Sequence, residues 1–174
     1  MSTTATDKRS AGFVHRLGKS REEAIEVRVG ETAVAKGSGT LLASGVGSCV
    51  IVTLYDPKRR VAALAHALLP SSPHRRDEES SASDAKYVDA AIDVMLERMF
   101  ACGAKRKNLE AKIVGGANMF AEFRSNVGKD NVAAAKGKLE AEGIELAGES
   151  TGGNVGRSVE LCVASGTVTA KTRF

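Results

Sequence analysis

Apolar and polar positions follow two different periods along the chain, and each period predicts a different kind of element. Residues 25–34 alternate apolar with polar or glycine positions, which is the two-residue period of a half-exposed strand. Residues 48–56 and 61–69 are nearly continuous apolar runs, typical of buried strands. Further strands are expected at residues 40–44, 109–116, 144–150, 158–165 and 167–173.

Two segments instead follow the three- and four-residue spacing of helices. The first begins near Ser83, a favourable N-cap residue, has Asp84 in its first turn and ends at Gly103. The second spans residues 127–143. Because these helices alternate with strands and hairpins, the pattern predicts an α/β domain with a mixed, mostly antiparallel sheet and two main helices.

The chain shows no internal repeat and no linker, so we expect a single domain. This domain should cover residues 25–174, preceded by a flexible basic N-terminal extension at residues 1–24 that has little to bury. The polar loop at residues 70–83 is the longest candidate for a mobile flap.

Composition narrows the class of protein further. With 174 residues, of which 43% are hydrophobic and 26% charged, the chain has the balance of an ordinary soluble domain. No apolar run approaches the roughly 20 residues of a membrane span, and the N-terminus has no signal-peptide pattern. Three cysteines and three histidines lie at scattered positions that form neither a disulfide framework nor a metal site. We therefore expect a cytoplasmic protein with free thiols and without membrane insertion, metal or cofactor.

The net charge of +4 does not by itself indicate nucleic acid. Much of the positive excess lies in the N-terminal extension, and the chain has no Trp, two Tyr and five Phe for stacking on bases. Two glycine clusters, at residues 114–120 and 151–157, match neither the dinucleotide-binding nor the P-loop pattern and are expected to form tight turns. We expect no nucleic-acid partner, and binding through the basic extension is the least favoured hypothesis.

Candidate chemistry lies in the two apolar runs. Cys49 stands near the start of the first run, and His66 interrupts the second, where an imidazole is unusual. If residues 57–60 form a hairpin loop, Ile51 faces His66, and Cys49 is its diagonal neighbour on the same face. A bulge or a one-residue slip would place the two side chains on opposite faces, so the pattern permits the pair without requiring it.

A cysteine–histidine pair would be chemically useful. An adjacent imidazolium lowers the pKa of a thiol and favours the thiolate, and the same histidine can then protonate a leaving amine. Gly47 would let a substrate carbonyl approach the backbone, and the amide of Cys49 is a candidate oxyanion donor. The alternative is a purely structural role, because a buried cysteine is usually an inert hydrophobe and a histidine in an apolar strand is usually a hydrogen-bonded core residue. Cys102 and Cys162 are expected to be structural.

A series of motifs adds to this interpretation. In chain order they read GVGSCVIVTLYDP, AALAHALLP, YVDAAIDVMLERMFACGAKRKNLEAKIVGGANMF, VGKDN and TGGNVGR. Together they resemble the CheD family of chemoreceptor glutamine deamidases, from about Val29 to about Gly166. Any one motif is weak, but their combination is specific.

The resemblance implies an α/β sandwich related to bacterial toxin deamidases. It implies an enzyme that hydrolyses the side-chain amide of selected glutamines on methyl-accepting chemotaxis receptors, with Cys49 as nucleophile and His66 as base. Many family members also bind a CheC-type phosphatase of the response regulator, so the resemblance suggests this phosphatase as a partner beside the receptors. The same site could hydrolyse a glutamyl methyl ester, and the sequence does not separate the two activities.

One position departs from the family pattern. The family has a threonine six residues before the cysteine, which orients the histidine, and this chain has Ala43 there. The adjacent Ser44 could serve as a third catalytic member if a local bulge turned it to the same face. Otherwise a backbone carbonyl or water must fix the imidazole, or the site is weakened. The competing hypothesis is therefore a catalytically weakened binding module that docks receptors or a CheC-type phosphatase.

Substrate contacts are expected at the residues before the cysteine and beside the glycine turns. The predicted contacts are Gly47, Ser48, Gly115, Gly116, Asn118 and Arg157. Asn118 and Arg157 are assigned on their positions beside the turns alone.

Overall fold

The computed structural model describes residues 13–16, 23–73, 85–120, 122 and 125–173. Its elements are β1 (Phe13–Arg16), β2 (Ala24–Glu26), β3 (Thr32–Lys36), β4 (Thr40–Val46), β5 (Val50–Asp56), β6 (Val61–Ala67), α1 (Val88–Ala101), the 3₁₀-helix η2 (Arg106–Asn108), β7 (Glu110–Gly115), α2 (Val127–Ala141), β8 (Glu145–Thr151), β9 (Gly156–Cys162) and β10 (Val168–Arg173).

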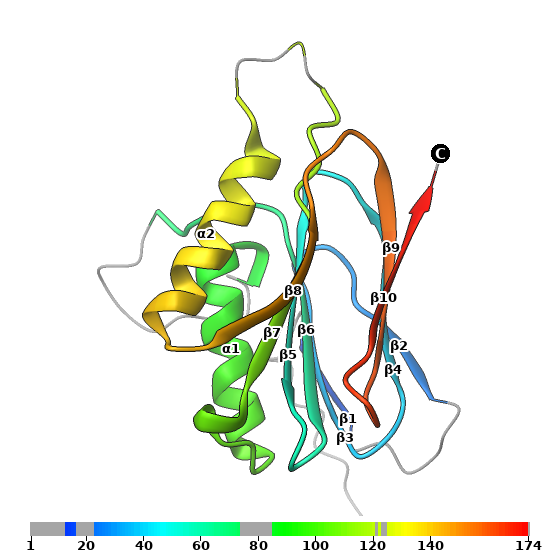
Figure 1. Cartoon of the computed structure of the whole chain (residues 1–174), viewed down its shortest axis with the longest axis vertical. Helices are drawn as coiled ribbons and strands as arrows, with labels where there is room; N and C mark the ends of the chain where they lie inside the picture. The colour runs from blue at the N-terminus through cyan, green and yellow to red at the C-terminus, as the bar shows by residue number, and fades with distance from the viewer. Residues whose placement is uncertain (1–12, 17–22, 74–84, 121, 123–124, 174) are drawn as a thin grey trace, which may run out of the picture.

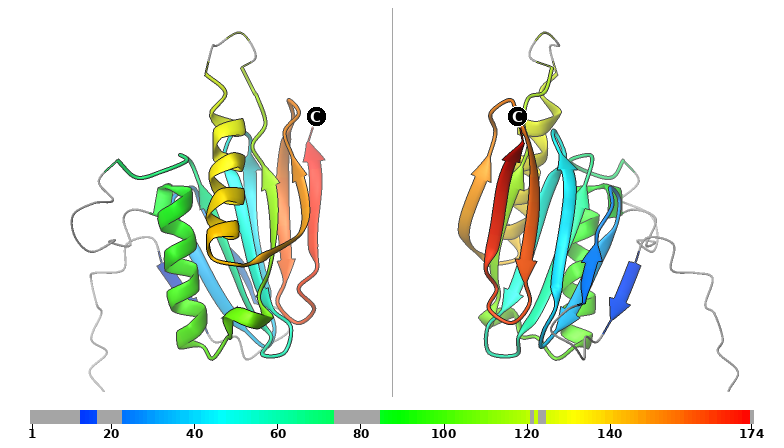
Figure 2. Two further views of the ribbon diagram at one scale, coloured as in Figure 1. Left: turned by 60° about the vertical axis from the view of Figure 1, so that its left-hand side comes forward. Right: turned by 90° about the vertical axis from the view of Figure 1, so that its right-hand side faces the viewer.

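The strands form two sheets. One has six strands in the order β1-β3-β6-β5-β7-β8, and the other has four in the order β10-β9-β4-β2. The pairs β1–β3, β2–β4 and β7–β8 are parallel, and the other pairs are antiparallel. Figure 1 shows the six-stranded sheet between the two α-helices and the four-stranded sheet, and Figure 2 shows the same layers from two sides. The fold is therefore the predicted α/β sandwich with mostly antiparallel pairing, divided between two sheets.

Two hydrophobic cores explain why the central strands are apolar on both faces. Alternate residues of β5 and β6, such as Val52 and Ala65, pack with α1 and α2 in the first core. The residues between them, such as Ile51 and Leu64, pack against β4 and β9 in the second core. A strand that is buried on both faces reads as a continuous apolar run, because neither set of alternating side chains meets water.

The β5–β6 hairpin has the predicted register, with Ile51 opposite His66 and Asp56 opposite Val61. Asp56 helps to hold the end of this hairpin, because its buried carboxylate accepts hydrogen bonds from the backbone amides of Lys58 and Arg59 at 2.9 and 3.0 Å. The same carboxylate accepts from the Lys105 amide at 2.9 Å, which ties the turn to the segment after α1. These bonds fix the loop length on which the register depends.

The strand predicted at residues 25–34 is in fact two strands in different sheets, β2 and β3. A turn separates them, with a hydrogen bond of 2.9 Å from the Glu31 amide to the Arg28 carbonyl. Gly30 occupies the third position of this turn with φ +82°, a conformation that suits glycine and that a regular strand does not contain. The alternating pattern did not reveal the break.

Helix α1 begins at Val88, with Tyr87 as its N-cap residue, later than the predicted start. The predicted N-cap Ser83, the first-turn Asp84 and most of the predicted flap lie outside the described residues. Within the predicted N-terminal extension, β1 pairs in parallel with β3. Most of residues 1–24 also lie outside the described residues, so the flexible extension and its boundary stay predictions.

Candidate active site

Cys49 and His66 project into the same space between the two sheets. Cys49 belongs to the second core together with Ile51 and Leu64. His66 lies two residues beyond Leu64 on β6, so it points to the same face, where its ring meets the Val27 carbonyl. Cys49 is 8% exposed and His66 is 1% exposed. Cys49 therefore keeps a small opening to solvent, whereas His66 is enclosed.

The segment just before β3 holds His66 from three directions. The His66 Nδ1 lies 3.2 Å from the Val27 carbonyl oxygen. The backbone amide of His66 donates to the Glu31 carbonyl at 3.1 Å, and its carbonyl accepts from the Gly30 amide at 2.8 Å. Because a carbonyl only accepts, Nδ1 carries the proton in this bond, and the lone pair of the neutral ring is on Nε2. The buried Nε2 has no partner among the described residues, so this nitrogen is available as a base.

Burial controls the charge of both groups. It raises the pKa of the Cys49 thiol, and the hydrogen bond from the Cys49 backbone amide offsets this only in part. Burial also lowers the pKa of His66, against the opposing effects of the Val27 carbonyl and the Glu31 carboxylate. Both shifts favour the neutral forms, a thiol at Cys49 and an uncharged imidazole at His66. The directions of both shifts differ from the predicted thiolate, because desolvation is the largest effect on each group.

Alkylation of Cys49 by iodoacetamide tests this charge state. Because only the thiolate reacts, the rate constant at Cys49 is expected to rise about tenfold per pH unit from pH 6 to pH 8 and to continue rising beyond it. Peptide mass spectrometry separates this site from Cys102 and Cys162, which are also free thiols. A rate that is already constant between pH 6 and pH 8 would instead indicate a thiolate–imidazolium pair.

The loop of residues 47–49 is anchored through its carbonyl groups. The Gly47 carbonyl accepts from the Ala117 amide at 2.9 Å, and the Cys49 carbonyl accepts from the Gly116 amide at 2.8 Å. In the described part of the chain, the amides of Ser48 and Cys49 donate to no backbone carbonyl. The loop thus directs its carbonyl groups into the protein, and its two N–H groups without a backbone acceptor are candidates for an oxyanion site.

Gly115 and Gly116 are needed where β7 passes this loop. Gly115 has φ +111°, and a Cβ atom there would collide with the Cys49 carbonyl oxygen and lie 2.7 Å from Val46. Gly116 has φ +66°, and a Cβ atom there would lie 2.7 Å from the Gly128 carbonyl. Both glycines therefore support the nucleophile loop by close backbone packing, which is a different role from the predicted contact with substrate.

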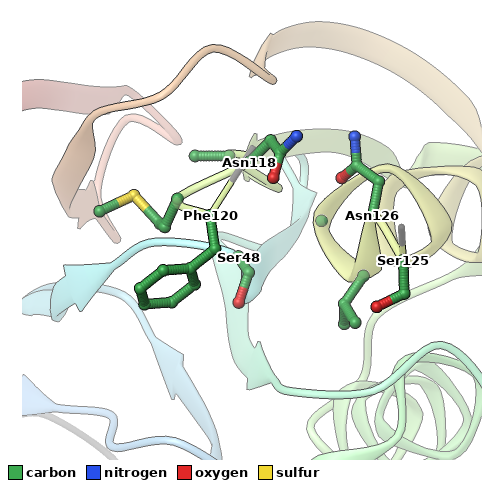
Figure 3. A pocket seen from close by; sticks show the side chains of 9 residues that line it. Ser48, Asn118, Phe120, Ser125 and Asn126 are labelled. Carbon is green, nitrogen blue, oxygen red and sulfur yellow. The ribbon is translucent and has the colours of Figure 1, made fainter. Parts of the chain in front are cut away.

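A pocket of about 160 Å³ opens beside the loop (Figure 3). Figure 3 shows the side chains of Ser48, Asn118, Phe120, Ser125 and Asn126 around it. The lining residues are Ser48, Ala117, Asn118, Met119, Phe120, Ser125, Asn126, Val127 and Gly128. The wall is uncharged and combines hydroxyl and carboxamide groups with apolar side chains, which suits a neutral polar side chain such as a carboxamide.

Two predicted site residues lie differently from expectation. A bulge does interrupt the β4–β9 pairing between Ala43 and Val46, but Ser44 on this bulge is exposed, whereas His66 is enclosed. Since the His66 Nδ1 bonds to a backbone carbonyl, the structure does not support Ser44 as the group that orients the ring. Arg157 lies opposite Val46 on β9 and is almost fully buried, and its Nη1 has no partner among the described residues.

Two further residues at this site were missed by sequence reasoning. The first is Val27, which acts through its main chain and has no side-chain signal. The second is Asn131 of α2, which is fully buried and donates from Nδ2 to the Ser48 and Leu68 carbonyls at 2.9 and 3.0 Å. A signal for Asn131 was present, because Asn131, Ala135 and Leu139 recur every four residues on the buried side of the helix. A polar residue in an apolar stripe calls for a specific partner.

Across the described ranges, no three His, Cys, Asp or Glu side chains converge in a way that could hold a metal ion. Neither α-helix in the described part of the chain is long and apolar enough to cross a membrane. Cys162, expected to be structural, is exposed at the end of β9.

The geometry defines a candidate thiol-dependent hydrolase, with a cysteine and an oriented imidazole directed into the space between the sheets and a small pocket beside the cysteine loop. The family model described as CheD chemotactic sensory transduction matches residues 68–172. The chain belongs to the CheD family.

Three relatives support this assignment. The probable chemoreceptor glutamine deamidase CheD of Thermococcus kodakarensis is 43% identical over 147 residues, which cover 83% of this chain and 89% of the relative. The chemoreceptor glutamine deamidase CheD of Thermotoga maritima is 43% identical over 140 residues, with coverages of 80% and 86%. The probable chemoreceptor glutamine deamidase CheD 2 of Geobacter metallireducens is 42% identical over 148 residues, with coverages of 83% and 90%. Alignments of this length necessarily include Cys49 and His66.

Proposed function

We propose that this chain is a protein-glutamine deamidase that converts glutamine side chains of methyl-accepting chemotaxis receptors to glutamate and ammonia. The relatives described above carry the name of this activity. The observation that carries the chemistry is the β5–β6 register, which directs Cys49 and His66 into the same space between the sheets. No cofactor is needed, because the reaction is a hydrolysis that a thiol and an imidazole can perform.

The first half of the reaction forms a thioester. The His66 Nε2 accepts the Cys49 proton as the sulfur attacks the carboxamide carbon of the substrate, so the thiolate forms only during attack. The amides of Ser48 and Cys49 are placed to stabilise the negative oxygen of the tetrahedral intermediate. His66 then returns the proton to the leaving nitrogen, and ammonia departs.

The second half hydrolyses the thioester. The neutral His66 removes a proton from a water molecule as the water oxygen attacks the thioester carbon. His66 then gives this proton to the Cys49 sulfur as the carbon–sulfur bond breaks. The products are a glutamate side chain and the free thiol. The Val27 carbonyl supports each step, because it holds the ring in the tautomer that leaves Nε2 available.

Substrate recognition belongs to the pocket face. Ser48 and Asn118 line the pocket, and the neighbouring Met119 and Phe120 are exposed, the latter by 70%. We infer that a receptor segment lies on this face while its glutamine reaches Cys49. Arg157 remains a proposed substrate contact. Because Arg157 is buried, a substrate group would have to enter the space between the two sheets to reach it.

A CheC-type phosphatase is a second proposed partner. The family resemblance suggests that it docks at the deamidase site, so it should compete with the receptor for the same face. We infer that both encounters take place in the cytoplasm, where the three free thiols would stay reduced.

Intact-mass analysis of a receptor fragment tests the proposed function. Each converted glutamine adds about 1 Da, because an amide is replaced by an acid. Peptide mapping then locates the converted positions, and a fragment carrying glutamyl methyl esters reports the competing esterase activity through a loss of about 14 Da per ester. Receptor binding without any mass change would overturn the deamidase and support the binding module.

A further inference from the structure

Asn131 connects the two halves of the candidate active site. Its carboxamide is fully buried, and its single nitrogen donates both hydrogens, one to the Ser48 carbonyl and one to the Leu68 carbonyl. Ser48 directly precedes Cys49, and Leu68 follows His66 by two residues on the same chain segment. One side chain on α2 therefore ties the nucleophile loop to the end of the strand that carries the imidazole.

The planarity of the peptide bond gives the Ser48 contact a further consequence. The peptide between Ser48 and Cys49 is trans, so the Ser48 carbonyl and the Cys49 amide point in opposite directions. When Asn131 draws the carbonyl toward α2, the amide must point away from α2. The side chain of Cys49 lies on that far side too, because it packs in the second core between the sheets, whereas α2 packs on the first core. An oxygen that develops charge after attack by that sulfur would lie on the same side.

The neighbouring carbonyls do not duplicate this contact. Gly47 and Cys49 each bond to the backbone of the segment after β7, through Ala117 and Gly116. Among the described residues, the Ser48 carbonyl accepts a hydrogen bond only from the side chain of Asn131. The orientation of the Ser48–Cys49 peptide thus depends on one carboxamide.

Asn131 also carries a cost of its own. Its Oδ1 is buried and has no partner in the described part of the chain. A buried acceptor without a partner is unfavourable, so the two hydrogen bonds from Nδ2 must offset that cost.

We propose that Asn131 is a positioning residue that aims the Cys49 amide at the oxyanion and keeps Cys49 in register with His66. This inference rests on the proposed hydrolase chemistry. It assigns no contact between Asn131 and substrate, because both of its donor hydrogens are used inside the protein.

The test compares Asn131→Ala and Asn131→Asp with a matched control, Ala135→Gly, which removes a buried methyl group one turn further along the same helix. Deamidation of a receptor fragment is followed by mass. We expect kcat to fall about 10- to 100-fold in both Asn131 variants with KM within about twofold, because an oxyanion donor acts on the transition state. The aspartate side chain has the shape of asparagine but cannot donate to the two carbonyls, so Asn131→Asp should be no more active than Asn131→Ala. Ala135→Gly should lower the melting temperature and leave kcat within about twofold.

Two reactions of Cys49 that need no receptor complete the test. Butyraldehyde, labelled with ¹³C at its carbonyl, mimics a glutamine side chain and forms a hemithioacetal whose oxygen occupies the oxyanion position. We expect its affinity to fall about 10-fold or more in Asn131→Ala. Alkylation by iodoacetamide forms no oxyanion, so its pH profile should match that of the wild-type protein.

The outcomes separate this inference from the proposed function. A wild-type protein that binds butyraldehyde but never changes the receptor mass would overturn the deamidase, and the aldehyde affinities would still decide the role of Asn131. The role of Asn131 is overturned if aldehyde affinity is unchanged in Asn131→Ala. It is equally overturned if alkylation falls in proportion to kcat, or if Ala135→Gly loses as much kcat as the Asn131 variants.

Discussion

Replacing Cys49 with alanine is expected to abolish receptor deamidation, with a loss in kcat of more than about 10⁴-fold. Without the sulfur, no thioester can form, and His66 alone would have to activate water against an unactivated amide. The fold should persist, because the change removes one atom at an edge of the second core where the side chain is already slightly exposed. The mass of a receptor fragment is the measurement, made over a time course long enough to detect the residual rate.

Two further variants make this result specific. Cys49→Ser keeps a hydroxyl in the same place, yet it should stay at least about 10³-fold slower, since a neutral hydroxyl is a much weaker nucleophile than sulfur. Cys162→Ala removes an exposed thiol at the far end of β9 and should keep kcat within about twofold. If Cys49→Ala still converts glutamines, the thiol mechanism fails, whatever the fate of the other two variants.

Replacing His66 with asparagine is expected to lower kcat by about 10²- to 10⁴-fold. Asparagine can place an amide nitrogen near the position of Nδ1 and keep the hydrogen bond to the Val27 carbonyl, but it has no base at the position of Nε2. The loss would thus report proton transfer rather than the loss of a buried hydrogen bond. A denaturation midpoint close to the wild-type value would confirm that the fold is retained.

The pH dependence provides the second measurement on this variant. Wild-type activity needs neutral His66, so kcat/KM should fall as the pH drops through the His66 pKa. Burial lowers this pKa, so the midpoint of the fall should lie below the ordinary value of about 6.5, and the protein should keep more than half of its activity at pH 6.5. His66→Asn should lack this acidic decline. If the variant kept the decline, another group would have to be the base.

The central part of the site could be predicted from the sequence because one short loop determines it. Once Asp56 and Val61 face each other across the hairpin, the pairing of Ile51 with His66 follows from the regular spacing of an antiparallel ladder. The two main helices and most strands were predictable for the same reason, since each depends on a local period of apolar residues. The division of the strands between two packed sheets could not be predicted, because the sequence of a strand buried on both faces does not show which element covers each face.

The remaining errors come from groups that have no side-chain pattern. The break at Gly30 lies inside an alternating run, and the carbonyl that orients His66 belongs to a valine. The neutral state of Cys49 depends on how much water the fold removes from around the sulfur, and this follows from packing between elements distant in sequence. Asn131 was the exception, because its place in an apolar stripe was visible and could have been questioned.

Because a main-chain oxygen holds the imidazole, truncation of the protein would have an unexpected effect. A shortened polypeptide that began at Thr32 would still contain the whole β5–β6 hairpin, with both reactive side chains and their pairing intact. It would nevertheless lack the three-residue edge strand β2 and the Val27 carbonyl that follows it, so its imidazole could rotate or adopt the other tautomer. The smallest active fragment must therefore include Val27, well before the first residue that takes part in the chemistry.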